Sequence, residues 1–185
     1  MDAITEAINY FYRTLEDKPK QSDKHMDGFS DLLKSSLDFE KVKEKHSAVV
    51  NGLVINKRWD LTAENNNNQY AFEFKSILSS RFGRNFNSRV EEAIGVGLDA
   101  KANNKNIKLG YLFLLQNDDD KSFDHHQKVD KFCTALVDKY KIYESVLAID
   151  ITQDRYYYIH NNYTQFVKAF QKNSFKFNLL RFFNV

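Results

Sequence analysis

The stretch that most constrains the fold is LGYLFLLQ at 109–116, which is apolar almost throughout. A continuous apolar run of this length is typical of a strand that is buried on both faces of a sheet. Such a strand needs helices on both sides of the sheet to exclude water. The sequence therefore predicts an α/β protein with a mixed central sheet flanked by helices.

Hydrophobic periodicity divides the rest of the chain into further elements. An amphipathic helix is indicated near the N-terminus by residues at helical spacing: Ile4, Ala7, Ile8, Phe11 and Leu15. The expected helices are 4–15, 26–45, 87–105, 125–140 and 164–172, and the expected strands are 48–55, 58–63, 70–76, 109–116, 145–151 and 156–160. The central elements follow the order αβββαβ. At 185 residues, without an internal repeat or a linker, the sequence predicts one domain over 1–185.

Two of the expected strands flank an asparagine tract at 65–68. Because Asn tolerates positive φ, the tract predicts the tip of a β-hairpin. If the hairpin is symmetric about the middle of the tract, Asp60 lies directly opposite Glu73. Lys75 then faces the same side of the sheet as Glu73, since side chains alternate along a strand.

Directly opposed carboxylates, with Cβ atoms about 5 Å apart, repel one another unless a cation lies between them. Hard oxygen ligands on a strand pair suit Mg²⁺, so Asp60 and Glu73 are candidate metal ligands. Lys75 is a candidate catalytic residue with them, placed to orient a water, support its deprotonation or stabilise charge on a phosphate. The alternative is an ordinary surface hairpin, because Asp followed by Glu-x-Lys is common by chance.

The segment 76–87, SILSSRFGRNFN, is long for a connection between a strand and a helix, where about 2–6 residues are usual. Arginine and asparagine suit phosphates and base edges, and the N-terminus of the following helix would add backbone donors. The segment therefore predicts a DNA-binding loop with these candidate contacts: Arg81, Arg84, Asn85, Asn87 and Arg89. The alternative is that Phe82 and Phe86 anchor a surface loop whose arginines are solvated.

The helix expected after this segment carries further candidate residues. The pattern Ser88-x-x-Glu91 predicts a capping box at its start. Glu92 is expected to support the metal ligands or to bind a second metal ion. His125 and His126 lie outside any zinc-binding pattern and are expected to be solvated.

The charge and cysteine content narrow the class of protein. A net charge of +2 is too small to indicate nucleic acid by itself, although no acidic residue lies between Lys75 and Arg89. The single cysteine, Cys133, excludes a disulfide framework and is expected to be buried. No signal peptide and no membrane-spanning run are visible, so we expect a cytoplasmic protein.

Taken together, these motifs resemble the XhoI-like type II restriction endonucleases of the PD-(D/E)xK nuclease superfamily. The resemblance rests on four blocks in the family's order: NKRWDL at 56–61, AFEFKS at 71–76, FGRNFNSRVEEAIG at 82–95 and LGYLFLL at 109–115. It covers most of the chain from 24 to 149, including an early helix that begins at MDGF. The fold that it implies is the restriction-endonuclease-like αβββαβ core.

The resemblance implies a homodimer that uses Mg²⁺ to cut both strands of a palindromic DNA site and leaves 5′-phosphate ends, with CTCGAG as the family's type site. On this sequence, Asp60 and Glu73 would bind the metal ion and Lys75 would serve the attacking water. Arg84 and Ser88 stand where the family usually has Asn, which leaves the recognition sequence open.

Two other functions remain open from the sequence. One is a nuclease of the same fold that serves repair or a modification-dependent defence system. The other is a non-catalytic DNA-binding module, which the intact Asp, Glu and Lys set disfavours. An acidic triplet at 118–120 predicts a solvated loop tip, and the apolar tail 175–183 is either a dimer surface or part of the core.

Overall fold

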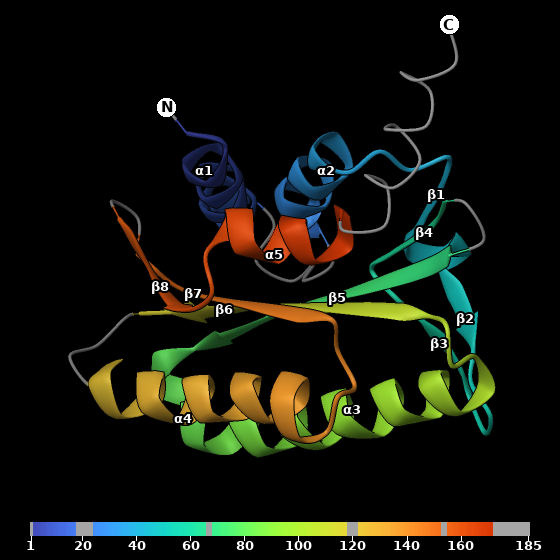
Figure 1. Cartoon of the computed structure of the whole chain (residues 1–185). Helices are drawn as coiled ribbons and strands as arrows, with labels where there is room; N and C mark the ends of the chain where they lie inside the picture. Colours follow the sequence, from blue (N-terminus) through green and yellow to red (C-terminus); the bar gives the residue numbers. More distant parts are fainter. Residues whose placement is uncertain (1, 18–23, 66–67, 118–121, 153–154, 172–185) are drawn as a thin grey trace, which may run out of the picture.

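The central feature of the fold is a six-stranded mixed sheet with the order β1-β4-β5-β6-β7-β8 (Figure 1). Strands β5, β6 and β7 are parallel to one another, and the other neighbouring pairs are antiparallel. A separate two-stranded sheet is formed by β2 and β3. The computed structural model describes residues 2–17, 24–65, 68–117, 122–152 and 155–171. The strands are β1 (Lys41–Glu44), β2 (Val49–Asn51), β3 (Asn56–Arg58), β4 (Leu61–Asn65), β5 (Asn68–Leu78), β6 (Lys108–Gln116), β7 (Ser145–Ile151) and β8 (Tyr156–His160).

Helices cover both faces of the large sheet, as predicted (Figure 1). Helices α1, α2 and α5 pack on one face, and α3 and α4 pack on the other. The helices are α1 (Ala3–Asp17), α2 (Asp27–Ser36), α3 (Phe82–Asn103), α4 (Ser122–Thr134) and α5 (Tyr163–Gln171), and a π-helical segment, Ala135–Lys139, extends α4. The expected α/β class is therefore confirmed.

Alternate residues of β6 enter two separate hydrophobic cores. Leu112 and Leu114 belong to the core shared with α1, α2 and α5. Tyr111 and Phe113 belong to the core shared with α3 and α4. Because both faces of this strand are buried, its sequence shows no alternation between polar and apolar residues.

Strands β4 and β5 pair in the register that the asparagine tract predicted. Leu61 pairs with Phe72, and Asn65 pairs with Asn68. The expected tip at 66–67 lies outside the described residues. Asp60 immediately precedes β4, so the confirmed register directs it toward Glu73.

The expected helix over 26–45 is wrong beyond Ser36. Helix α2 ends there, Leu37 adopts an extended backbone (φ −122°, ψ 133°), and β1 follows. Strand β1 pairs with β4 along its whole length. Without β1, the donors and acceptors on that edge of β4 would lack partners in the sheet, so strand pairing prevails over the helical pattern.

The expected strand over 48–55 is wrong at its end. Leu53, Val54 and Ile55 form an exposed turn between β2 and β3, and Val54 is 82% exposed. The carboxylate of Asp99 on α3 accepts hydrogen bonds from the N–H groups of Val54 at 2.8 Å and Ile55 at 3.2 Å. This distant side chain replaces the hydrogen bonds of a sheet, which periodicity alone does not reveal.

The remaining elements agree with the sequence within a few residues. Strands β7 and β8 have the predicted bounds, and α1, α4 and α5 lie where periodicity placed them. Cys133 is buried, as expected. No helix among the described residues is long and apolar enough to span a membrane. The single domain over 1–185 stays a prediction, and the acidic triplet and the apolar tail lie outside the described ranges.

A methyl group added at Gly110 of β6 would overlap the aromatic core. Its Cβ would lie 2.4 Å from Cδ1 of Phe72 and 3.0 Å from Cζ of Phe170. We expect Gly110→Ala to lower the free energy of unfolding by about 1–3 kcal/mol, because overpacking a dense core forces side chains away from their rotamers. Urea denaturation followed by circular dichroism measures this change.

Gly95→Ala is the matched control. Gly95 is exposed in the interior of α3, and nothing would lie within 4 Å of its added Cβ. This variant should gain about 0.5–1 kcal/mol, because Ala loses less backbone freedom than Gly in a helix. Equal stabilities of the two variants would contradict the close packing of Phe72 over Gly110.

Candidate active site

Four segments bring charged side chains together beside the start of β4. Asp60 immediately precedes β4, Glu73 and Lys75 lie on β5, Lys57 lies on β3, and Glu92 lies midway along α3. Ion pairs connect the lysines to the two glutamates. The structure thus gathers four residues that the sequence singled out and adds Lys57.

Asp60 lies at an interruption between β3 and β4, where the sequence predicts one continuous strand over 58–63. Its Oδ2 accepts a hydrogen bond from the backbone N–H of Phe74 at 2.7 Å. Burial, and after it the carboxylate of Glu73, raises the pKa of Asp60 to about 6. The contribution of Glu73 to this pKa is the repulsion between carboxylates that the hairpin register predicts.

Glu73 is almost completely buried, with 4% of its surface exposed. Its Oε1 accepts a hydrogen bond from Lys57 at 2.9 Å and forms an ion pair with Lys75. Its Oε2 is buried and has no hydrogen-bond partner among the residues that the structure describes. A buried carboxylate oxygen without a partner is costly, so this atom marks a position for a ligand.

Glu92 and three cations complete the cluster. Oε1 of Glu92 lies 2.9 Å from Nζ of Lys57 and 3.4 Å from Nζ of Lys75, while its Oε2 lies 2.9 Å from Nη1 of Arg89. Burial opposes ionisation of Glu92, but these cations prevail and lower its pKa to about 2. Burial also opposes the charge on Lys75, but Glu73 and the other carboxylates prevail and raise its pKa. Lys75 is therefore an ammonium ion at neutral pH.

Lys57 is the member of the cluster that sequence reasoning missed. Its strand, β3, pairs with β2 rather than with the main sheet, so no periodicity argument places it beside Glu73. The one signal is its position in the block NKRWDL, two residues before the aromatic ring of Trp59. Its ammonium lies 6.0 Å from the centroid of that ring.

The segment 76–87 is not a loop, contrary to the prediction. Strand β5 continues to Leu78, and α3 begins at Phe82 after one 3₁₀ turn. The rings of Phe82 and Phe86 are buried and stacked, with centroids 4.4 Å apart, and His125 of α4 stacks on Phe82 at 4.1 Å. This packing starts the helix earlier than the local sequence indicates.

The predicted DNA contacts therefore lie on the 3₁₀ turn and the first turns of α3. All five are partly or fully exposed: Arg81, Arg84, Asn85, Asn87 and Arg89. The last of them, Arg89, is turned toward the carboxylate cluster by its ion pair with Glu92. These residues therefore lie on a helical surface instead of the expected loop, and Arg89 connects that surface to the charged cluster.

Two further expectations near α3 are wrong. The capping box over 88–91 does not open the helix, because α3 begins before it. The two histidines expected to be solvated make side-chain contacts instead. Nδ1 of His125 lies 3.0 Å from Oγ of Ser79, and Nε2 of His126 lies 2.5 Å from Oδ2 of Asp150. These contacts fasten α4 to the ends of β5 and β7.

A mixed sheet covered by helices on both faces, with three parallel strands at its centre, has the architecture of the restriction-endonuclease-like fold. Comparison with known proteins agrees with this class. Residues 13–133 match the family described as restriction endonuclease XhoI, and the whole charged cluster lies within them. The chain belongs to the XhoI restriction endonuclease family.

One curated relative is the type II restriction enzyme BstVI of Geobacillus stearothermophilus. The two are 31% identical over 114 residues, which covers 51% of this chain and 51% of that enzyme. The chain thus spans about half the length of the curated relative that it matches. No solved structure matches the chain.

Replacing Asp60 by Asn tests whether its environment, burial first and the charge of Glu73 second, raises the pKa of this carboxyl group. The pKa of Asp60 in the folded protein, about 6, is above the ordinary value of 3.8, so the folded state binds this proton more tightly than the unfolded chain. Asp60 therefore lowers stability as pH rises from about 4 to 6, and the loss persists at higher pH. We expect Asp60→Asn to be more stable than the native protein by about 1–3 kcal/mol at pH 8, and equally stable at pH 4.

Urea denaturation in EDTA at the two pH values measures this difference. The side chain of Asn can keep the hydrogen bond from Phe74, so the change removes charge with little loss of contact. Asp38→Asn, at an exposed position after α2, is the matched control and should show no such gain. The same pH dependence in both variants would show that folding does not raise the pKa of Asp60.

Proposed function

We propose that this chain is a type II restriction endonuclease that makes site-specific double-strand cuts in palindromic DNA. The proposed reaction is Mg²⁺-dependent hydrolysis of a phosphodiester that leaves 5′-phosphate ends, at a site similar to CTCGAG. One observation carries the proposal: Asp60, Glu73 and Lys75 converge within the residues that match the XhoI family. The printed name of BstVI, a type II restriction enzyme, supports the same class of reaction.

The carboxylates of Asp60 and Glu73 fit a hard divalent cation. Oε2 of Glu73 is buried without a partner among the described residues. Burial is the first cause of the raised pKa of Asp60, and the charge of Glu73 is the second. The described residues contain no complete group of three His, Cys, Asp or Glu ligands, and Mg²⁺ suits a site with few protein ligands because it retains several waters. When bound, the ion would neutralise the paired carboxylates and activate the phosphodiester as a Lewis acid.

Lys75 is suited to hold charge rather than to accept a proton. Its raised pKa keeps it protonated at neutral pH, next to Glu73. From this position it would orient the attacking water and stabilise the negative charge that develops on the phosphate. Lys57 bridges Glu73 and Glu92 and would keep both carboxylates in place during the reaction.

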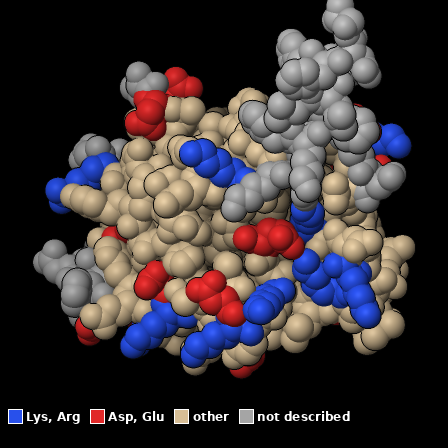
Figure 2. Space-filling model, viewed as in Figure 1, with Lys and Arg blue, Asp and Glu red and all other residues tan. Residues whose placement is uncertain are grey.

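The start of α3 is the proposed DNA-binding surface. The exposed contacts lie there at the positive end of a 22-residue helix, whose N-cap residue, Arg81, makes no side-chain capping hydrogen bond. Figure 2 shows acidic and basic side chains interspersed over the helical layer formed by α3 and α4, and the basic side chains gathered on the right of this face lie near the end of α3 rather than near its start (Figure 1). DNA affinity would therefore depend on individually placed residues rather than on overall charge.

One catalytic cluster cuts one strand, and the two strands of a duplex have opposite polarity. Cutting both strands within a palindrome is achieved most directly by two copies related by two-fold symmetry. We therefore include a homodimer in the proposed function.

Glu73→Gln tests the catalytic assignment. The amide keeps the size of the side chain but lacks the charge needed for a metal ion, so cleavage should fall by at least about 10²-fold while DNA binding is retained. The assay is Mg²⁺-dependent digestion of methylated and unmethylated plasmid of known sequence, with sequencing of the ends. Glu64→Gln, at an exposed position on β4, is the matched control and should cut normally.

The same digestion separates the alternatives. Discrete fragments from unmodified plasmid support a type II enzyme. Cleavage restricted to methylated, damaged or branched DNA identifies a nuclease of another system. Binding without any cleavage by the native protein identifies a non-catalytic module, and full activity of Glu73→Gln removes this residue from the active site.

Arg84→Ala tests the DNA-binding surface. Arg84 is exposed on the first turn of α3, so its loss should weaken DNA binding about ten-fold or change the preferred site without changing metal affinity. Fluorescence anisotropy with labelled duplex, in Ca²⁺ to prevent turnover, measures the affinity. Arg13→Ala on α1 serves as control, since α1 covers the opposite face of the sheet. An unchanged affinity and cleavage pattern in Arg84→Ala would show that this surface does not read DNA.

A further inference from the structure

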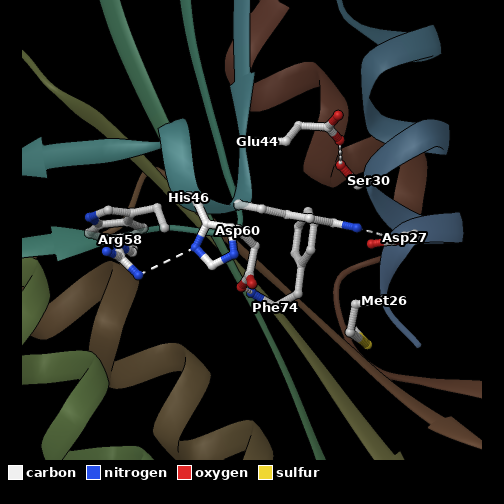
Figure 3. A pocket seen from close by; sticks show the side chains of 10 residues that line it. Met26, Asp27, Ser30, Glu44, His46, Arg58, Asp60 and Phe74 are labelled. Carbon is white, nitrogen blue, oxygen red and sulfur yellow. Dashed lines mark hydrogen bonds and ion pairs between the residues drawn. The ribbon is translucent and has the colours of Figure 1, made fainter. Parts of the chain in front are cut away.

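A pocket of about 230 Å³ opens beside Asp60 and has no role in the function described so far (Figure 3). Asp60 and Phe74 form its wall toward the catalytic cluster, Met26 lines the side formed by the start of α2, and His46 and Arg58 face it from the opposite side. The volume equals that of about eight water molecules. It is large enough for a phosphate group together with part of a sugar.

The other carboxylates of this pocket are already paired. Asp27 forms an ion pair with Lys45 at 2.8 Å, and Glu44 forms one with Lys34 at 3.0 Å. These pairs cancel their own charges within the pocket wall. The charge that remains on the rim opposite α2 is the guanidinium of Arg58.

Arg58 and His46 are joined by a hydrogen bond (Figure 3). Nη1 of Arg58 lies 3.3 Å from Nδ1 of His46, and Arg58 has no carboxylate partner among the residues that the structure describes. A guanidinium only donates, so Nδ1 of His46 accepts and the imidazole proton is on Nε2. The pair therefore offers a cationic fork and a second N–H donor, which together suit a phosphate.

The backbone that carries His46 is fixed to the candidate catalytic residue. Lys45 has a left-handed backbone (φ 52°), which is uncommon for a residue with a side chain and which concentrates at functional sites. Its N–H donates to the carbonyl oxygen of Asp60 at 3.3 Å, and the N–H of Trp59 donates to the carbonyl oxygen of Ala48 at 2.8 Å. His46 lies in a second 3₁₀ turn, Lys45–Ser47, and these bonds hold that turn at a set position relative to Asp60.

We propose that Arg58 and His46 bind a phosphate of the DNA strand that is cut, next to the phosphate that reacts at Asp60 and Glu73. The inference rests on the proposed nuclease function. Because Asp60 belongs to both the pocket and the cluster, a strand that places one phosphate at the cluster brings a neighbouring phosphate to the pocket. A phosphate contact of this kind fixes the position of the strand without reading its sequence.

Arg58→Ala and His46→Ala test this contact through the salt dependence of DNA binding. The measurement is anisotropy of a labelled synthetic duplex at several salt concentrations, with Ca²⁺ in place of Mg²⁺. Loss of one phosphate contact should reduce the slope of log affinity against log salt by about 0.9 and lower affinity about ten-fold in Arg58→Ala. His46→Ala should lower affinity less and leave the slope nearly unchanged, because it removes a donor and its support of Arg58 but no cation. Arg58→Lys should keep most of the slope, since it keeps the charge.

Arg13→Ala on α1 is the matched control and should keep the native slope and affinity. Arg58 is exposed, so its variants should melt at the native temperature, which a thermal scan checks. An unchanged slope and affinity in Arg58→Ala would overturn the proposal. So would displacement of the duplex by inorganic phosphate or a mononucleotide at the concentrations at which DNA binds, since the pocket would then take a small phosphate. A reduced slope in Arg58→Ala, combined with a native protein that cuts no plasmid, would support the phosphate contact and contradict the nuclease function.

Discussion

The fold and the candidate site depend on one constraint, which is that like charges must be held together beside the start of β4. The register of β4 and β5 directs Asp60 and Glu73 toward each other, and burial together with the charge of Glu73 raises the pKa of Asp60. Cations from other segments offset this cost: Lys57 comes from β3 and Lys75 from β5 itself. The acidic groups are therefore stabilised only when β3, β4 and β5 are all in place.

Helix α3 connects the charged cluster around Glu73 to the proposed DNA-binding surface. The stacked rings of Phe82 and Phe86 fix its first turns, and Glu92 joins the charged cluster at its middle. Seven residues separate Asn85 from Glu92, which corresponds to about 10 Å along a helix axis. A contact made by the first turns would therefore be transmitted to the cluster through a rigid element over a distance of a few nucleotides. A flexible loop in this place would leave the distance undefined.

The pocket beside Asp60 would provide a second DNA contact, on the side of the cluster away from the start of α3. The strained backbone at Lys45 and its hydrogen bond to Asp60 fix the position of His46, which in turn holds Arg58. Asp60 thus belongs both to the proposed metal site and to the wall of the proposed phosphate pocket. On this account the DNA strand is held on both sides of the reacting phosphate, by α3 and by the segment from Lys45 to Arg58.

The sequence by itself determined the buried strand β6 and the β4–β5 hairpin. Both depend on local patterns, namely an unbroken apolar run and a turn tract flanked by strands, and the second pattern was enough to bring Asp60 and Glu73 together. Resemblance to a family then supplied the function to be tested.

The tertiary structure decided what local patterns leave open. The chain after Ser36 leaves the helix, despite its helical pattern, because β1 pairs with the edge of β4. The contact of Phe82 with His125 of α4 fixes the start of α3. Lys57 reached Glu73 only through the folding of the β2–β3 hairpin onto α3. In each case the deciding contact joins residues far apart in the chain, and its free energy exceeds the weak preference of the local sequence for another conformation.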